Sequence, residues 1–283
     1  MSKKGLINLN TINKILDINL KLNIIKKNIL TNFQHNPNYV RGDNNKNTVL
    51  LIEPRFIQHS LLVLANTYNK LGNNWNYVFY CGKSFKNTWR SLLPNFIELR
   101  ELEHDNFVNT KLYSDFCKKK ELWESLYGKY VLTIQLDTWI MNLEPYTIDF
   151  FISLNKSYIG GNMDYTWSYF NRKNIYHTFR NFNGGLSLRK KNDMIKIIVN
   201  FPPLETIDDN SNFLSEHEDV YFTTGCINLN LPIGDDEACS HFSLHTKYYD
   251  KYFGIHQPKQ YVSPYLNNSH KFLKFLNVSL KLL

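Results

Sequence analysis

The stretch YVLTIQLDTW, residues 130–139, decides the fold class of this chain. Its apolar and β-branched residues, Val131 to Ile134 with Leu136, are typical of a buried strand, and a lone carboxylate, Asp137, stands where that strand should end. In open α/β sheets, ligands bind beyond the carboxyl ends of the strands. Asp137 is therefore predicted to lie where a metal ion or a phosphate would be bound. On this basis we interpret the chain as an enzyme.

Strands and helices alternate on the N-terminal side of this stretch. The apolar patterns predict strands at 49–53, 75–81, 96–102 and 130–136, and helices at about 57–71 and 112–127. Such alternation implies a mostly parallel central sheet with helices on both faces, a three-layer α/β/α fold. After residue 145 the alternation breaks into short strands, aromatic loops and helices, which we expect to bind substrate.

Two changes in composition divide the chain. Residues 6–33 alternate Ile and Leu with Asn and Lys, a pattern that fits an amphipathic helix by its length, although a strand-like alternation competes. Residues 34–47 are rich in turn-forming residues and predict a linker. We therefore expect three parts: an N-terminal helical extension and linker at 1–47, a catalytic domain at 48–265 and a tail at 266–283.

Composition and charge exclude several classes of protein. With 283 residues, 43% of them apolar, the chain is long enough to bury a substantial core. It has no run of about 20 apolar residues that would span a bilayer and no secretory signal at its start, so we expect a cytoplasmic protein. Residues 1–46 carry a net charge of +6 and residues 247–283 one of +5, which leaves −3 between them. Because the positive charge lies at the two ends, we expect no nucleic-acid partner.

The four cysteines show no disulfide spacing, which fits a reducing compartment. A zinc site can be imagined from Cys226, Cys239, His241 and His245, but no Cys-x-x-Cys anchors it.

Polar residues follow the first and the fourth predicted strands. Glu53 and Arg55 follow the first strand, where they would reach the base or ribose of a nucleotide; a surface charge pair explains them equally well. Asp137 suits a hard cation such as Mg or Mn. The alternative for Asp137 is a helix cap, with Thr138 and Trp139 starting a helix behind it.

Two further segments carry candidate ligand-binding residues. Asn183, Gly184 and Gly185 lead into an apolar run that ends at Arg189. The missing side chains would let a sugar or phosphate lie against the backbone and the arginine would neutralise its charge, whereas a plain turn before a strand explains the glycines as well. His256 follows a short apolar segment and can ligate a metal through a neutral imidazole, although a lone histidine is more often structural.

The segment at 215–222 contains a candidate general base. Ser215 and Glu218 have the spacing of a capping box, which would assign Glu218 to a backbone amide at a helix start. That leaves Asp219 without a structural role. A carboxylate in the first turn of a helix stays ionised, which suits a general base.

Five motifs in a fixed order carry a resemblance: QLDTW at 135–139, YIGG at 158–161, NGGLSLR at 183–189, EDVYF at 218–222 and FGIH at 253–256. By these motifs, the chain resembles a family of GT-A-type glycosyltransferase-like proteins catalogued as a domain of unknown function. The resemblance covers roughly residues 48–262.

The resemblance implies roles for individual residues. Asp137 would stand for the last Asp of the Asp-x-Asp motif, which binds a divalent cation and the diphosphate of a nucleotide sugar, while Gln135 replaces the first Asp. His256 would complete the metal site. Asp219, next to Glu218, resembles the catalytic base of inverting transferases with a Glu-Asp-Val motif.

The implied activity is transfer of a sugar, with inversion, from a UDP-linked or similar nucleotide-sugar donor to a hydroxyl of a glycan or protein acceptor. A noncatalytic carbohydrate-binding or structural protein on the same scaffold is the first alternative. A sugar nucleotidyltransferase is the second, but it would need a glycine-rich phosphate loop after the first strand, where the chain has Glu53-Pro54-Arg55-Phe56.

Overall fold

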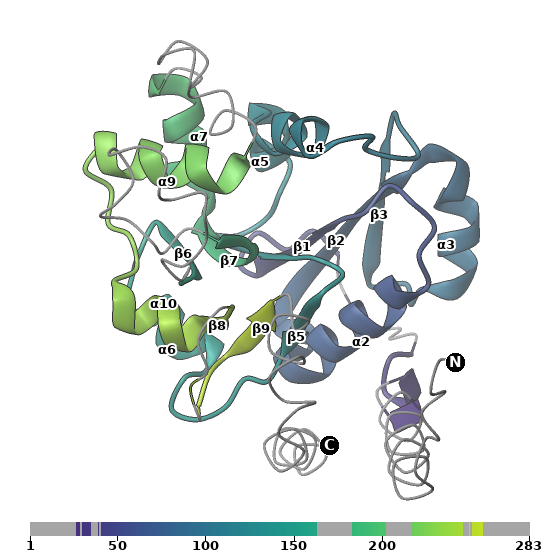
Figure 1. The fold of residues 1–283 in the computed structure, drawn as a ribbon. Helices are drawn as coiled ribbons and strands as arrows, with labels where there is room; N and C mark the ends of the chain where they lie inside the picture. Colours follow the sequence, from purple (N-terminus) through teal and green to yellow (C-terminus); the bar gives the residue numbers. More distant parts are fainter. Residues whose placement is uncertain are drawn as a thin grey trace, which may run out of the picture.

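The structure, a computed structural model, describes residues 27, 28, 30–34, 39, 41–162, 183–201, 217–245, 249 and 251–256. These residues form an α/β fold around one large sheet (Figure 1). The six strands of that sheet lie in the order β3 (Ile97–Leu102), β2 (Trp75–Gly82), β1 (Asn47–Ile52), β4 (Tyr130–Ile134), β7 (Asn183–Lys190) and β6 (Tyr158–Gly161).

The sheet is mostly parallel, as the sequence predicts. Strands β1, β2, β3 and β4 pair in parallel, and β7 is antiparallel to both β4 and β6. A smaller sheet is formed by β5 (Thr138–Ile140), β9 (Gly254–His256) and β8 (Ser243–Leu244).

Helices cover both faces of the large sheet, so three layers are present (Figure 1). Alternate residues of a strand point to opposite faces. Thus Val49 and Leu51 pack with α2 (His59–Leu71) and α3 (Lys86–Leu92). Leu50 and Val131 pack on the other face with α4 (Thr110–Cys117), α5 (Lys120–Glu124), α7 (Lys191–Asn200) and α9 (Glu218–Asn228). In the described part of the chain, the remaining α-helices are α6 (Ile148–Ser153) and α10 (Asp236–Phe242), and short 3-10 helices span Gly72–Asn74 and Lys83–Phe85.

The structure corrects one predicted helix and excludes one alternative. The single helix expected at 112–127 is divided into α4 and α5, because the indole N–H of Trp123 donates to the Cys117 carbonyl at 2.8 Å and ends the first helix. The alternative of a helix behind Asp137 is wrong, because Thr138–Ile140 form strand β5. The hydroxyl of Thr138 accepts the N–H of Gln135 and donates to the Gly185 carbonyl, both at 3.0 Å, which ties this segment to β7.

Strand order places the candidate residues together. The chain runs from β1 outward through β2 and β3, then returns to the opposite side of β1 with β4, so the order reverses between β1 and β4. Ligands of open α/β sheets bind at such a reversal, beyond the carboxyl ends of the strands. Glu53 to Arg55 and Gln135 to Asp137 follow those two strands. Since Ile134 pairs with Leu186 of antiparallel β7, the glycines at the start of β7 reach the same edge.

The predicted helix at 6–33 lies mostly outside the described residues, although residues 27, 28, 30 and 31 are helical. Phe33 is buried against the domain, with ring centroids 6.0 Å from Tyr68 and 5.5 Å from Phe96. Within the part of the chain that is described, no helix is both long and apolar enough to cross a membrane.

Candidate functional site

The glycine pair at the start of β7 forms the centre of the site. Gly184 and Gly185 lie within the strand, so the interpretation of a plain turn is wrong. A Cβ on Gly184 would come within 2.7 Å of Arg189 Nη2, 2.8 Å of Asp219 Cβ and 2.9 Å of Glu218 Oε1, and a Cβ on Gly185 would overlap His256 Nε2. The missing side chains therefore let the chain's own polar groups approach β7 closely.

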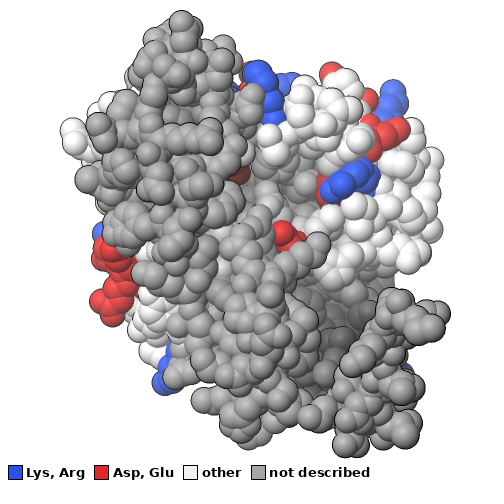
Figure 2. Space-filling view, in the orientation of Figure 1, with Lys and Arg blue, Asp and Glu red and all other residues white. Residues whose placement is uncertain are grey.

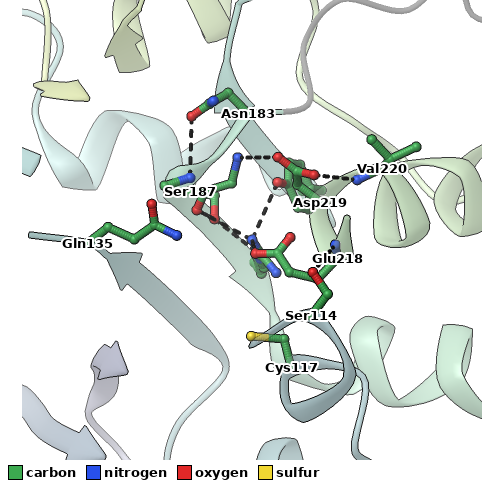
Figure 3. A network of polar contacts seen from close by, with 12 residues as sticks. Ser114, Cys117, Gln135, Asn183, Ser187, Glu218, Asp219 and Val220 are labelled. Atoms are coloured by element: carbon green, nitrogen blue, oxygen red, sulfur yellow. Dashed lines mark hydrogen bonds and ion pairs between the residues drawn. The ribbon is translucent and has the colours of Figure 1, made fainter. Parts of the chain in front are cut away.

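Asp219 lies in the first turn of α9, beside β7. Its Oδ2 accepts the N–H of Gly184 at 3.0 Å, and its Oδ1 accepts the N–H of Val220 at 2.8 Å (Figure 3). Burial and the neighbouring Glu218 carboxylate raise the pKa of Asp219, and Arg189 and the two backbone N–H groups oppose that shift without cancelling it. A partly exposed carboxylate with a raised pKa can accept a proton.

Glu218 is the first residue of α9, so it does not stand three residues into the helix as a capping box requires. Its Oε1 lies 2.9 Å from Arg189 Nη2, and both side chains are buried. Ser215 lies outside the described residues. The capping interpretation is wrong for Glu218, and Arg189, 1% exposed, is placed to neutralise this carboxylate rather than a ligand.

Asp137 and His256 meet at the end of β4. The Oδ1 of Asp137 is 3.3 Å from His256 Nε2, and the same nitrogen is 3.3 Å from Gln135 Oε1. Burial raises the pKa of Asp137, but the hydrogen bond and the charge of His256 outweigh burial. The pKa of Asp137 is therefore below its ordinary value. His256 is buried and reaches this edge because β9 pairs with β5, where it lies opposite Thr138.

These residues fit a divalent cation in part. An oxygen of Asp137 and a nitrogen of His256 face each other, a hard oxygen and an imidazole that suit Mn²⁺. Within the described ranges no three His, Cys, Asp or Glu side chains gather closely enough to hold a metal ion. A cation at this position would take its remaining ligands from Gln135, from water or from the oxygens of a bound phosphate.

The four residues considered as a zinc site, Cys226, Cys239, His241 and His245, have other contacts. His241 stacks on Tyr146, with ring centroids 3.9 Å apart, and His245 stacks on His256 at 5.5 Å. Cys226 and Cys239 are buried free thiols. We therefore assign no metal to these four residues.

Glu53 and Arg55 form the charge pair that the sequence offers as one of two interpretations. Arg55 Nε and Nη2 donate to the two carboxylate oxygens of Glu53 at 2.7 and 2.8 Å. Glu53 is buried and the arginine side chain is 53% exposed. Arg55 therefore stays accessible at the carboxyl end of β1, with its orientation fixed by Glu53.

Several contacts of the site could not be predicted from the sequence. Ser114 of α4 accepts the N–H of Glu218 through its hydroxyl at 3.1 Å, across 104 residues of chain (Figure 3). Asn183 accepts the N–H of Gly185 at 3.3 Å. Ser187 bridges Arg189 and Gly184. A serine in a helix or a strand looks like any other serine until the tertiary fold brings its partner near.

Comparison with known proteins assigns the chain to a family. No curated protein matches the chain. A family described as "Protein of unknown function (DUF5672)" matches residues 96–258, more than half of the chain, which confirms the expectation of a family catalogued as a domain of unknown function. The match contains the segments that supply Asp137, Gly184, Asp219 and His256, while Glu53 and Arg55 precede it. The chain belongs to this DUF5672 family of proteins of unknown function.

Proposed function

We propose that this protein is a nucleotide-sugar-dependent glycosyltransferase of the GT-A type, with Asp219 as its catalytic base. The observation that carries the proposal is the position of two groups beside one glycine pair: Asp219 contacts Gly184, and His256, with Asp137, contacts Gly185. Because consecutive Cα atoms are about 3.8 Å apart, Asp219 Cβ and His256 Nε2 lie within roughly 12 Å of each other. Adjacent residues of a strand point to opposite faces, so Asp219 and His256 approach β7 from opposite sides, and a donor sugar diphosphate would have to lie across the start of this strand to reach both.

The proposed reaction is a single displacement. Asp219 takes the proton of an acceptor hydroxyl as its oxygen attacks the anomeric carbon of the donor. A carbon–oxygen bond forms to the acceptor, the bond from the anomeric carbon to the diphosphate breaks, and the nucleoside diphosphate leaves with the electron pair. The raised pKa of Asp219 suits this step, since a general base works best when its pKa is close to the working pH.

Asp137 and His256 would hold a Mn²⁺ or Mg²⁺ ion with the diphosphate, and Gln135 would contribute its amide oxygen. The cation would offset the negative charge of the leaving diphosphate. On the face drawn in Figure 2, a small group of acidic atoms lies near the middle, apart from the mixed acidic and basic residues at the upper right.

The noncatalytic alternative also has an observation in its favour. Each carboxylate oxygen of Asp219 accepts a backbone N–H, so this side chain already stabilises the start of α9 against β7. A carbohydrate-binding protein would need Asp219 for that role alone. The loop after β1 argues against the nucleotidyltransferase alternative. It contains the Glu53–Arg55 ion pair where a glycine-rich phosphate loop would be needed.

Asp219→Asn separates the two leading functions. A panel of UDP-sugars is screened by thermal shift with Mn²⁺, and each stabilising donor is then assayed for release of UDP. The variant keeps the shape of the side chain and loses the proton acceptor, so we expect donor binding to persist and release to fall by about 10²- to 10⁴-fold. Asp235→Asn is the matched control: Asp235 also accepts one backbone N–H, from Ala238 at 2.8 Å, and Asn caps a helix as well as Asp does.

Full activity of a folded Asp219→Asn protein would remove Asp219 from the role of base. The pH profile of the wild type gives a second check. Because the deprotonated base is the active form, release should rise with pH through the pKa of Asp219, at a pH above the ordinary aspartate value of about 3.9. Stabilisation by a donor without any turnover would favour the carbohydrate-binding alternative.

A further inference from the structure

Arg189 contacts both structures that hold Asp219 in place. Its Nη2 donates to Glu218 Oε1 at 2.9 Å and lies 3.4 Å from the Gly184 carbonyl oxygen. Glu218 is joined to Asp219 by a peptide bond, and Gly184 donates its N–H to the Asp219 carboxylate. The contacts therefore form a closed ring from Arg189 through α9 to Asp219 and back through β7.

The guanidinium has little freedom to move within this ring. Its Nε donates to Ser187 Oγ at 2.8 Å, and that hydroxyl donates to the Gly184 carbonyl at 3.0 Å. Aromatic rings surround it, with centroids 4.9 Å away in Tyr158, 5.4 Å in Phe222 and 5.9 Å in Trp123. A planar fork of donors can bond Glu218, Ser187 and Gly184 together, which the single ammonium of a lysine cannot reproduce.

We infer that Arg189 is a positioning residue for the proposed transfer: by bonding Glu218 and the Gly184 carbonyl, it fixes the Asp219 carboxylate against β7 and sets the charge around it. Arg189 does not touch the ligand, since it is 1% exposed. For the reaction that Asp219 would catalyse, this inference rests on the proposed function. For the position of Asp219, it rests on the ring of contacts.

The titratable groups around Asp219 lie on three other elements besides its own helix. Glu218 precedes it on α9, Arg189 extends from β7, Tyr158 from β6, and Cys117 from α4. Of these groups, Glu218 and Arg189 bear opposite charges, so removing one of them leaves the other unbalanced. Loss of the Glu218 charge should make Asp219 easier to ionise, and loss of the Arg189 fork should make it harder.

Two variants test the inference. Glu218→Gln keeps an oxygen that accepts from Arg189 and removes the negative charge next to Asp219. We expect the acid limb of the UDP-release profile to move down by at least about one pH unit. Arg189→Lys keeps a positive charge without the fork, and we expect about 100-fold slower kcat with little change in donor KM, because small misplacement of a reacting group has effects of this size.

Arg100→Lys is the matched control. Arg100 is also a strand arginine paired with a glutamate, since its Nε donates to Glu98 at 2.7 Å, but it lies on β3, at the far edge of the sheet from β6 and next to β2. We expect it to retain kcat and the pH profile. A folded Arg189→Lys protein with wild-type kcat and pH profile would overturn the inference.

A titration of the Asp219 carboxyl carbon by ¹³C NMR, without any donor, covers the remaining outcomes. If Arg189→Lys does not fold, or no donor turns over, Glu218→Gln must still lower the pH at which Asp219 titrates. The same midpoint in wild type and Glu218→Gln would overturn the inference. A lowered midpoint together with no turnover of any donor by wild type would refute the proposed function and leave the control of Asp219 by this ion pair supported.

Discussion

The two sides of the large sheet are stabilised by different kinds of contact. Strands β1 to β4 bury apolar side chains on both faces, and Val49, Phe79 and Val131 are fully buried there. Strand β7 also buries Arg189 and Ser187, which bond to groups on α9 and on β7 itself. Apolar burial tolerates small shifts of the backbone, whereas a network of hydrogen bonds does not. Substitutions on the parallel side should therefore change stability, and those beside β7 should change chemistry.

The largest expected effect on stability is on the parallel side. Phe79→Ala removes a ring that is fully buried and lies 5.3 Å from Trp89, and we expect the free energy of unfolding to fall by about 3–5 kcal/mol. Urea denaturation measures this change. UDP release per folded molecule should stay close to wild type. Val108→Ala, at a side chain 78% exposed, is the control and should leave stability nearly unchanged.

Gly184→Ala should lower both stability and activity. The added methyl group would meet Arg189 Nη2, Asp219 and Glu218 at less than 3 Å, so we expect a loss of about 1–3 kcal/mol and loss of UDP release. Gly234→Ala is the control, because its methyl group would meet Cys239 Sγ at 2.6 Å, an apolar contact outside the site. Equal loss of activity in both variants would show that overpacking in general, and not the displacement of Asp219, is responsible.

The sequence predicts the parallel side of this comparison well. Apolar runs mark β1, β2, β3 and β4 to within two residues, because β1, β2 and β4 are buried on both faces and β3 buries Ile97, Leu99 and Leu102. It misses α3, where Trp89 is the one fully buried residue and no helical stripe of apolar residues is present. The prediction depends on local apolar periodicity, which is present in β1 to β4 and absent from α3.

The site could be predicted only in part. Asp137, Asp219 and His256 are identified by motifs, and the structure brings His256 and Asp137 together across more than 100 residues. The contacts of Arg189 and Glu218 could not be read from the sequence, since the two residues are 29 positions apart and each has a plausible local role, ligand contact for the arginine and helix capping for the glutamate. The partners of buried polar groups depend on the tertiary fold.

Asp137→Asn should affect the cation without affecting the fold. The side chain of Asp137 is 44% exposed, so we expect wild-type stability in the metal-free protein. An amide oxygen is a weaker ligand for Mn²⁺ than a carboxylate, so the thermal shift produced by Mn²⁺ with UDP should need about tenfold more Mn²⁺. The same midpoint for Mn²⁺ in both proteins would exclude Asp137 as a ligand. Asp105→Asn, a carboxylate that accepts the N–H of Ser84, serves as the control.

Gln135→Asp should have the smallest effect, and in the opposite direction. It places a second carboxylate near His256 Nε2, where the amide oxygen now lies at 3.3 Å. Without metal, the two neighbouring carboxylates should repel each other and lower the melting temperature slightly. With Mn²⁺ the loss should be reversed, because an ion that binds only the folded state stabilises it in proportion to its affinity. Gln34→Asp, at an exposed position, should show neither change. If Mn²⁺ alone stabilises Gln135→Asp no more than wild type, the cation does not bind at the end of β4, and the chemistry beside β7 would have to proceed through Asp219 without it.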